Sequence, residues 1–180
     1  MERPQKAPIV LAAGLFILAA VAEISTGRSR SLQDDGGERA RVAALAGVDE
    51  ALAHGDAAAA LQAWQRAYEA GRLNHGWRGL VEAADAGVRI ESEARGTAGP
   101  RARWVYLAAL DRARAERSVE GTMRVAEGFS RLGDREATER ALRIAAALAV
   151  HSGDIEAPRR VEAVRGRLLN RASSLTQARF

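Results

Sequence analysis

Apolar residues recur at every third or fourth position from residue 39 onward, which is the period of an amphipathic helix. The first such stripe consists of Val42, Leu45, Val48 and Leu52. Runs of β-branched residues are nearly absent, and alanine and leucine are abundant, so the pattern predicts an all-α fold. Seven helices are expected, at about residues 39–54, 56–70, 74–90, 101–117, 118–132, 134–150 and 155–171.

Gly-Asp pairs separate several of these helices. Glycine suits the position after a helix, and aspartate can cap the next one. Small residues then recur beside Trp64 on one face of the second helix, at Ala60, Ala63 and Ala67. Small residues on a shared face let a neighbouring helix approach closely. Antiparallel helix pairs with alanine-lined contacts are therefore expected, with turns at Gly55-Asp56, Gly133-Asp134 and Gly153-Asp154.

An N-terminal segment differs from the rest of the chain. Residues 9–22, IVLAAGLFILAAVA, carry no polar side chain and come after a short basic start. Two interpretations remain open. The segment is a signal peptide cleaved after Ala22, or it is a retained anchor over residues 8–27, near the lower length limit for a membrane span. We favour the anchor and divide the chain into an anchor or signal peptide (1–27), a linker (28–38), a helical domain (39–172) and a frayed tail (173–180).

The position of this segment predicts the location of the domain. An apolar segment so near the N-terminus usually directs export of the domain on its C-terminal side, although the flanking basic residues hardly discriminate between orientations. We therefore expect a bacterial envelope protein with one inner-membrane span and a periplasmic C-terminal domain. Cleavage after Ala22 would instead release the domain into the periplasm.

Composition narrows the possible functions. The net charge is +4, but Lys6 is the only lysine, and the arginines alternate with acids along the helices. Mixed charges of this kind are typical of solvated helix faces, so no nucleic-acid partner is expected. The last helix is rich in arginine. These arginines either form a solvated face or bind an anionic partner, and the sequence favours neither alternative: Arg159, Arg160, Arg165, Arg167 and Arg171.

The sequence gives no sign of catalysis. It contains no cysteine, and the three histidines (His54, His75 and His151) have no second metal ligand at a suitable spacing. No phosphate-binding loop, dinucleotide glycine pattern or nucleophile elbow is present. We expect no enzyme, no metal and no cofactor. The aromatic residues are expected to pack in the core rather than form a stacking platform: Trp64, Tyr68, Trp77, Trp104 and Tyr106.

Helix pairs with these turns resemble tetratricopeptide repeats. Gly55 is followed by small residues at Ala60, Ala63 and Ala67, with a large one at Trp64, as in that family. The residues after Gly133 match the same pattern in part. The segment that carries Trp77, Leu80 and Ala84 resembles the first helix of a repeat. The resemblance covers about residues 40–150 and implies a stack of helix pairs capped by the last helix. An irregular helical bundle is the alternative.

The resemblance also implies a binding groove, lined by the first helix of each pair. With repeats starting near residues 41, 74 and 119, the groove is acidic, with an apolar patch at one end. The partner expected there is a polypeptide segment with Lys or Arg and one or two apolar anchors. The groove residues are Asp49, Leu52, His75, Arg78, Glu82, Asp85, Glu120, Met123, Glu127 and Arg131.

These features predict a non-catalytic scaffold or assembly factor, anchored in the envelope, that holds protein partners. A small accessory subunit built permanently into a membrane complex is the alternative. An enzyme of unknown type is a third, and it would need a deep pocket that gathers His75 with Glu82 or Asp85.

Overall fold

The chain divides into two compact units, residues 1–36 and residues 37–180. The structure, a computed structural model, describes residues 36–73, 76–95 and 100–177, nearly all of which belong to the second unit. The predicted anchor over residues 8–27 lies outside the described residues. Among the described helices, none is both long enough and apolar enough to cross a bilayer.

The described residues form seven helices and no strand, which confirms the all-α prediction. Residues 36–53 are helical, and six helices come after them: α2 (Ala57–Leu73), α3 (Trp77–Arg95), α4 (Pro100–Ala115), α5 (Val119–Arg131), α6 (Arg135–Val150) and α7 (Ala157–Gln177). The chain is already helical at residues 36–38, where the sequence predicted a linker. α7 extends to Gln177, beyond the predicted end near Arg171.

A further difference from the prediction is at the end of α3. We expected that helix to stop near Ile90 and a loop to fill residues 91–100, but the helix continues to Arg95. Its added turn carries Glu91, which is buried, and an Oε1 atom of Glu91 accepts a hydrogen bond from the backbone N–H of Arg101, 3.2 Å away. The extra turn therefore supplies a partner for one of the free N–H groups at the start of α4.

The Gly-Asp turns are confirmed. Three glycines have positive φ angles, at +69° in Gly55 and +72° in both Gly133 and Gly153, a conformation that glycine adopts at little cost. Asp56 accepts a hydrogen bond from the backbone N–H of Ala59 (2.9 Å), and Asp134 accepts one from that of Ala137 (3.1 Å). One short motif thus ends a helix and caps the next.

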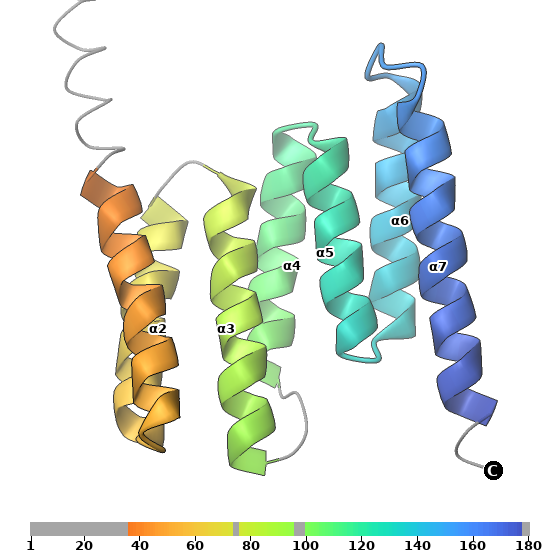
Figure 1. The fold of residues 1–180 in the computed structure, drawn as a ribbon. Coiled ribbons are helices and arrows are strands. Elements are labelled where there is room, and N and C mark those ends of the chain that lie inside the picture. The colour runs from red at the N-terminus through yellow and green to blue at the C-terminus, as the bar shows by residue number, and fades with distance from the viewer. Residues whose placement is uncertain (1–35, 74–75, 96–99, 178–180) are drawn as a thin grey trace, which may run out of the picture. The chain divides into compact units, whose positions relative to one another are not determined.

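The helices of the second unit lie in two rows (Figure 1). We call the helix over residues 36–53, α3, α5 and α7 the first layer, and α2, α4 and α6 the second layer. α2 packs against α3, α4 against α3 and α5, and α6 against α5 and α7; α3 also contacts α5, which contacts α7. α2 meets the helix over residues 36–53 at Gly47, where an added Cβ would lie 3.5 Å from the Cβ of Ala63. This arrangement of adjacent helix pairs is compatible with a helical repeat.

Successive helix pairs meet where an aromatic ring lies over a glycine. A Cβ atom added to Gly87 of α3 would lie 3.2 Å from the indole Nε1 of Trp64. One added to Gly121 of α5 would lie 2.8 Å from the ring of Trp77. Gly128 of α5 is covered in the same way by the ring of Tyr106. We call these three contacts the ring–glycine contacts. At Gly121 and Gly128 the helices lie at a separation that only a residue without a side chain permits, whereas at Gly87 an added Cβ would require the indole to move by a few tenths of an ångström.

Burial largely follows the predicted stripes. Trp64, Trp77 and Tyr106 are buried as expected, but Trp104 is 56% exposed and Val42 is 53% exposed. Trp104 was predicted to be buried with its helix's apolar stripe. It lies instead on the outward side of α4, because Ala102, Val105 and Tyr106 already fill the buried side.

The ring–glycine contacts predict an unusual response to alanine. Replacing Gly128 with alanine should lower the free energy of unfolding by about 1–3 kcal/mol, because the new methyl group overlaps the Tyr106 ring. Gly166 of α7, which has no atom within 4 Å of an added Cβ, is the matched control. Its replacement with alanine should raise the free energy of unfolding by about 0.5–1 kcal/mol. Urea unfolding monitored by circular dichroism measures both, and an unaffected Gly128→Ala variant would contradict the packing described here.

Candidate functional site

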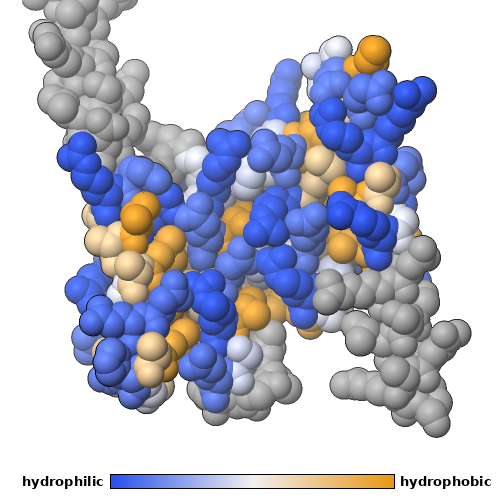
Figure 2. All heavy atoms as spheres, in the orientation of Figure 1, coloured by the Kyte–Doolittle hydropathy of each residue, from blue (hydrophilic) through white to orange (hydrophobic). Residues whose placement is uncertain are grey.

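The predicted groove residues within the described range all lie on first-layer helices. The face that carries this layer is largely hydrophilic, with smaller apolar areas between the polar ones (Figure 2). His75 lies outside the described residues. Leu52 and Met123 are half-buried and pack against the core, so they contribute less apolar surface than the sequence predicted.

Each predicted groove acid forms an ion pair with an arginine. Asp49 pairs with Arg89 (2.9 Å) and Glu120 with Arg78 (3.3 Å). Glu82 pairs with Arg41. Asp85 and Glu127 take part in the larger network described below. The sequence predicted an acidic surface, whereas the structure neutralises each of these five acids locally.

The pair between Glu82 and Arg41 is the most deeply placed. The Arg41 side chain is only 7% exposed and also bonds to Glu38, where its Nε lies 3.2 Å from the carboxylate. Its aliphatic stem runs over Gly79 of α3, where an added Cβ would lie 3.1 Å from the arginine Cδ. Glu82 therefore balances a nearly buried charge, and its role is structural as well as electrostatic.

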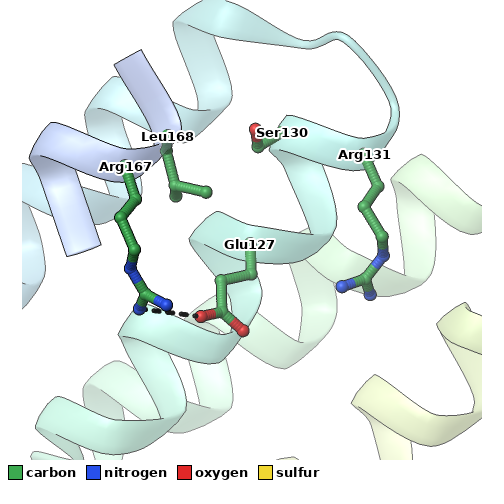
Figure 3. A pocket seen from close by; sticks show the side chains of 5 residues that line it. All are labelled: Glu127, Ser130, Arg131, Arg167 and Leu168. Atoms are coloured by element: carbon green, nitrogen blue, oxygen red, sulfur yellow. Dashed lines mark ion pairs between the residues drawn. The ribbon is translucent and has the colours of Figure 1, made fainter. Parts of the chain in front are cut away.

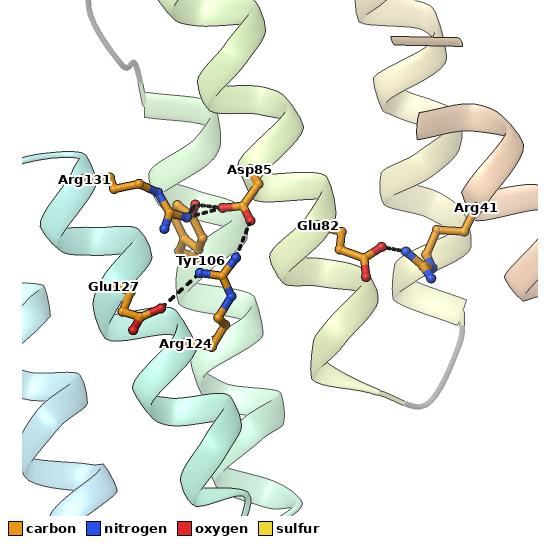
Figure 4. A network of polar contacts seen from close by, with 7 residues as sticks. All are labelled: Arg41, Glu82, Asp85, Tyr106, Arg124, Glu127 and Arg131. Carbon is orange, nitrogen blue, oxygen red and sulfur yellow. Dashed lines mark hydrogen bonds and ion pairs between the residues drawn. The ribbon is translucent and has the colours of Figure 1, made fainter. Parts of the chain in front are cut away.

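A network of polar side chains joins three helices (Figure 4). Asp85 of α3 accepts hydrogen bonds from the Tyr106 hydroxyl of α4 and from Arg131 and Arg124 of α5, the last at 3.3 Å. Arg131 also donates to the Tyr106 hydroxyl (2.9 Å), and Arg124 pairs with Glu127 (3.0 Å). Because Tyr106 also forms a ring–glycine contact, one residue connects the packing of the helix pairs to this network.

The network changes the proton affinity of its members. Burial of Tyr106, together with its hydrogen bond to the Asp85 carboxylate and the charge of that carboxylate, raises the pKa of the phenol well above its ordinary value. Burial alone would lower the pKa of Arg131, but its attraction to Tyr106 and Asp85 outweighs this effect and raises that pKa. Both groups are therefore held in their neutral-pH forms.

A pocket of about 270 Å³ lies between α5 and α7 (Figure 3). Glu127, Ser130 and Arg131 of α5 line one side, and Arg167 and Leu168 of α7 line the other. The Glu127–Arg167 pair spans the pocket at 3.8 Å, the longest of the ion pairs among the described residues. Glu127 and Arg131 were predicted as groove residues, whereas α7 was predicted only as a cap.

Three further arginines of α7 are balanced in the same way. Glu156 pairs with Arg159 (3.2 Å) and Glu162 with Arg165 (2.7 Å). Asp154 pairs with Arg160 (2.5 Å). The Arg160 hydrogen bond is the main cause that lowers the pKa of Asp154. Within the described part of the chain, no group of three His, Asp or Glu side chains is arranged to hold a metal ion.

Sequence reasoning missed several members of this site: Arg41, Arg89, Tyr106, Arg124 and Arg167. Arg124 stands three residues before Glu127, a spacing that brings the two together on a helix and that could have identified it. The contacts of Asp85 with Arg124 and Arg131 bridge 39 and 46 residues, and no local pattern encodes them.

Comparisons of the chain with known protein families, with curated proteins and with solved structures find no match. Functional conclusions therefore rest on the sequence and on the geometry of the described residues.

Glu82 and Glu120 should respond differently to neutralisation. Glu82→Gln leaves the nearly buried Arg41 with one carboxylate fewer and should cost about 1–3 kcal/mol of stability. Glu120→Gln breaks a pair whose side chains are 69% and 68% exposed and should cost about 0–1 kcal/mol. Urea unfolding of the two variants tests the contrast, and equal effects would show that burial of Arg41 does not matter.

The raised pKa of Tyr106 predicts a loss of stability in alkali. The folded-state pKa exceeds the ordinary value of 10.0, so the stabilisation is complete below pH 10 and falls as the pH rises above it. In a Tyr68→Phe variant, Tyr106 is the sole tyrosine of the chain. Its tyrosinate absorbance should appear only together with the loss of helical circular dichroism. Ionisation near pH 10 in the folded protein would contradict the burial of Tyr106 and its hydrogen bond to Asp85.

Proposed function

We propose that this protein is a non-catalytic scaffold or assembly factor that binds other polypeptides on the first layer of a tetratricopeptide-like stack of helix pairs. The observation that carries the proposal is the pocket between α5 and α7, which is lined by residues of the predicted groove face. A row of helices that present exposed, paired charges offers area and orientation, and it needs no reactive group.

The pocket also supports a class of partner. Glu127 lies between Arg124 at 3.0 Å and Arg167 at 3.8 Å, and the second of these pairs is long for an ion pair. An incoming Lys or Arg side chain can replace Arg167 at little cost, because Arg167 is 70% exposed and solvated. Leu168 supplies an apolar surface beside it. We propose a partner segment that carries a basic residue next to an apolar one.

We further propose that the domain works at the bacterial cell envelope, on the periplasmic side of the inner membrane. This proposal rests on the apolar run at residues 9–22 of the sequence. Attachment through residues 8–27 would confine the search for membrane-bound clients to two dimensions. Cleavage after Ala22 would release the same domain into the periplasm.

A second candidate is an accessory subunit built permanently into a membrane complex. The exposure of Trp104 supports it, because a large aromatic side chain that is half in solvent often marks a surface that is covered in an assembly. Under this proposal the second layer, which carries Trp104, makes the main contact, whereas the scaffold proposal places it on the first layer.

Site-specific photocrosslinking distinguishes these proposals. A benzoylphenylalanine probe replaces Ser130, which lines the first-layer pocket, or Gln62, an exposed second-layer residue, in the full-length chain in its native cells. The scaffold proposal expects discrete protein adducts from position 130 and none from position 62. Adding Glu127→Gln should reduce the adducts from position 130, because the basic residue of the partner loses its acceptor.

The reverse pattern, with adducts from position 62 alone, would support the accessory subunit and reject the groove. Adducts whose yield does not change with Glu127→Gln would reject the basic segment as the pocket's ligand.

A further inference from the structure

Helix α4 is apolar on two sides. Its buried side consists of Ala102, Val105, Tyr106, Ala109, Leu110 and Ala113. On the outward side, Trp104 is exposed, and Leu107 and Ala108 are half-buried one helical turn further on. We call Trp104, Leu107 and Ala108 the outer strip. A helix whose apolar surface exceeds what its own core can cover commonly marks a surface for interaction.

Tyrosine extends the outer strip onto the neighbouring helix. The ring centroid of Tyr68 in α2 lies 5.3 Å from that of Trp104, and Tyr68 also stacks on the buried Trp64 at 5.9 Å. Trp64 is fixed by a hydrogen bond from its Nε1 to the backbone oxygen of Ala83 (2.7 Å). Trp104 is therefore held outward by a chain of rings that is anchored in the core.

The same layer carries an excess of positive charge. The three second-layer helices contain nine arginines and four acidic residues, whereas the four first-layer helices contain twelve arginines and ten acidic residues. Arg103 and Arg135 form ion pairs. The other second-layer arginines form no ion pair with any residue that the structure describes: Arg66, Arg72, Arg101, Arg112, Arg114, Arg140 and Arg143.

We propose that the second layer docks on an anionic lipid bilayer, with Trp104 at the level of the head groups. Tryptophan and tyrosine favour that boundary, because an apolar ring and a polar edge are solvated there together. Unpaired guanidinium groups bind lipid phosphates, and Leu107 adds apolar area beside the indole. Within α4, helical spacing places Arg101, Arg112 and Arg114 near the outer strip, and Asp111 is the one acidic residue of that helix. The net charge and the polarity of this face therefore match such a surface.

The observations favour lipid over nucleic acid. Single-stranded nucleic acid is usually bound by a row of exposed aromatic rings that stack on successive bases. Here Trp64 and Trp77 are buried, and Trp104 has one aromatic neighbour, the half-buried Tyr68, so these residues form no row of exposed rings. The other residues of the outer strip, Leu107 and Ala108, are aliphatic. A bilayer accepts aliphatic side chains as readily as aromatic ones.

The docking proposal depends on the proposed membrane attachment in one respect: the attachment brings the domain close to a bilayer. Residues 28–35 separate the apolar segment from the described helices, and eight extended residues span at most about 28 Å. A domain tethered this closely would meet the lipid surface often, so weak docking would suffice.

The chain contains no cysteine, which permits single-site labelling of the full-length protein. An environment-sensitive NBD dye is attached at Ala108→Cys on the outer strip, or at Ser130→Cys on the first layer as the matched control. Each protein is added to vesicles of phosphatidylcholine alone or of phosphatidylcholine with about 30% phosphatidylglycerol. We expect a blue shift and quenching by lipid-borne nitroxides at position 108 in the anionic vesicles only, and no change at position 130.

Two variants test the residues that carry the proposal. Arg112→Gln with Arg114→Gln should lower the ratio of docked to undocked protein on the order of tenfold, and so should raising the salt to about 0.5 M. Trp104→Ser should remove the blue shift. The circular dichroism spectrum should be retained, because the Trp104 side chain is half in solvent. A signal at position 108 that is equal in neutral and anionic vesicles, or absent from both, would overturn the proposal.

Two further measurements separate the possible failures. Flotation of the unlabelled chain with neutral vesicles tests attachment through the apolar segment alone. If the chain floats but the dye at position 108 is silent, attachment stands and docking is rejected. If the dye responds to a single-stranded oligonucleotide and not to anionic vesicles, the second layer is a nucleic-acid surface, and the lipid proposal is wrong.

Discussion

The ring–glycine contacts determine how closely the four central helices, α2 to α5, can approach one another. Trp64, Trp77 and Tyr106 each reach from one helix to a glycine of another, where the absent side chain makes room for the ring. Alanine-lined contacts alone let two helices approach, but they do not fix the register of one helix against the other. A ring seated on a glycine fixes both the separation and the register of two helices, because a shift of one turn would place the ring against a Cβ atom. The polar network depends on this packing, since Tyr106 donates its hydroxyl to Asp85 from a ring held on Gly128.

In the proposed scaffold, the same arginine–carboxylate pairs would give the first layer both stability and binding specificity. Arg41 with Glu82 and Arg131 with Asp85 tie together helices that are distant in sequence, and their exposed edges remain available to a partner. Such a surface does not attract every basic polypeptide, because each acid already has a cation beside it. A bound partner would have to replace one ion pair with another. A partner whose geometry fits would therefore bind more tightly than one that only carries the right charge. The long Glu127–Arg167 pair is the place where such an exchange costs least.

Much of the fold follows from local rules, and much of the site does not. The turns at Gly55 and Gly133 and the caps at Asp56 and Asp134 could be predicted because each depends on a few adjacent residues. The groove positions could be placed on the first layer by the helical period and the repeat pattern. Their ion pairs could not, because the partners of Asp85 come from another helix pair. The exposure of Trp104 was also missed, because an apolar residue on an amphipathic helix is assigned to the core unless the size of that core is known. The extension of α3 was missed for a similar reason, since it depends on the contact of Glu91 with the next helix.

Every cation in the ion pairs described here is a guanidinium group, and the one lysine of the chain, Lys6, precedes the helical unit. Enzymes that acetylate or otherwise acylate lysine amines therefore find no substrate in residues 37–180. Guanidinium also keeps its proton at any pH at which the fold survives. If the protein is the scaffold that we propose, control over its clients would have to act on the client, on the amount of scaffold present, or on the carboxylate half of each pair.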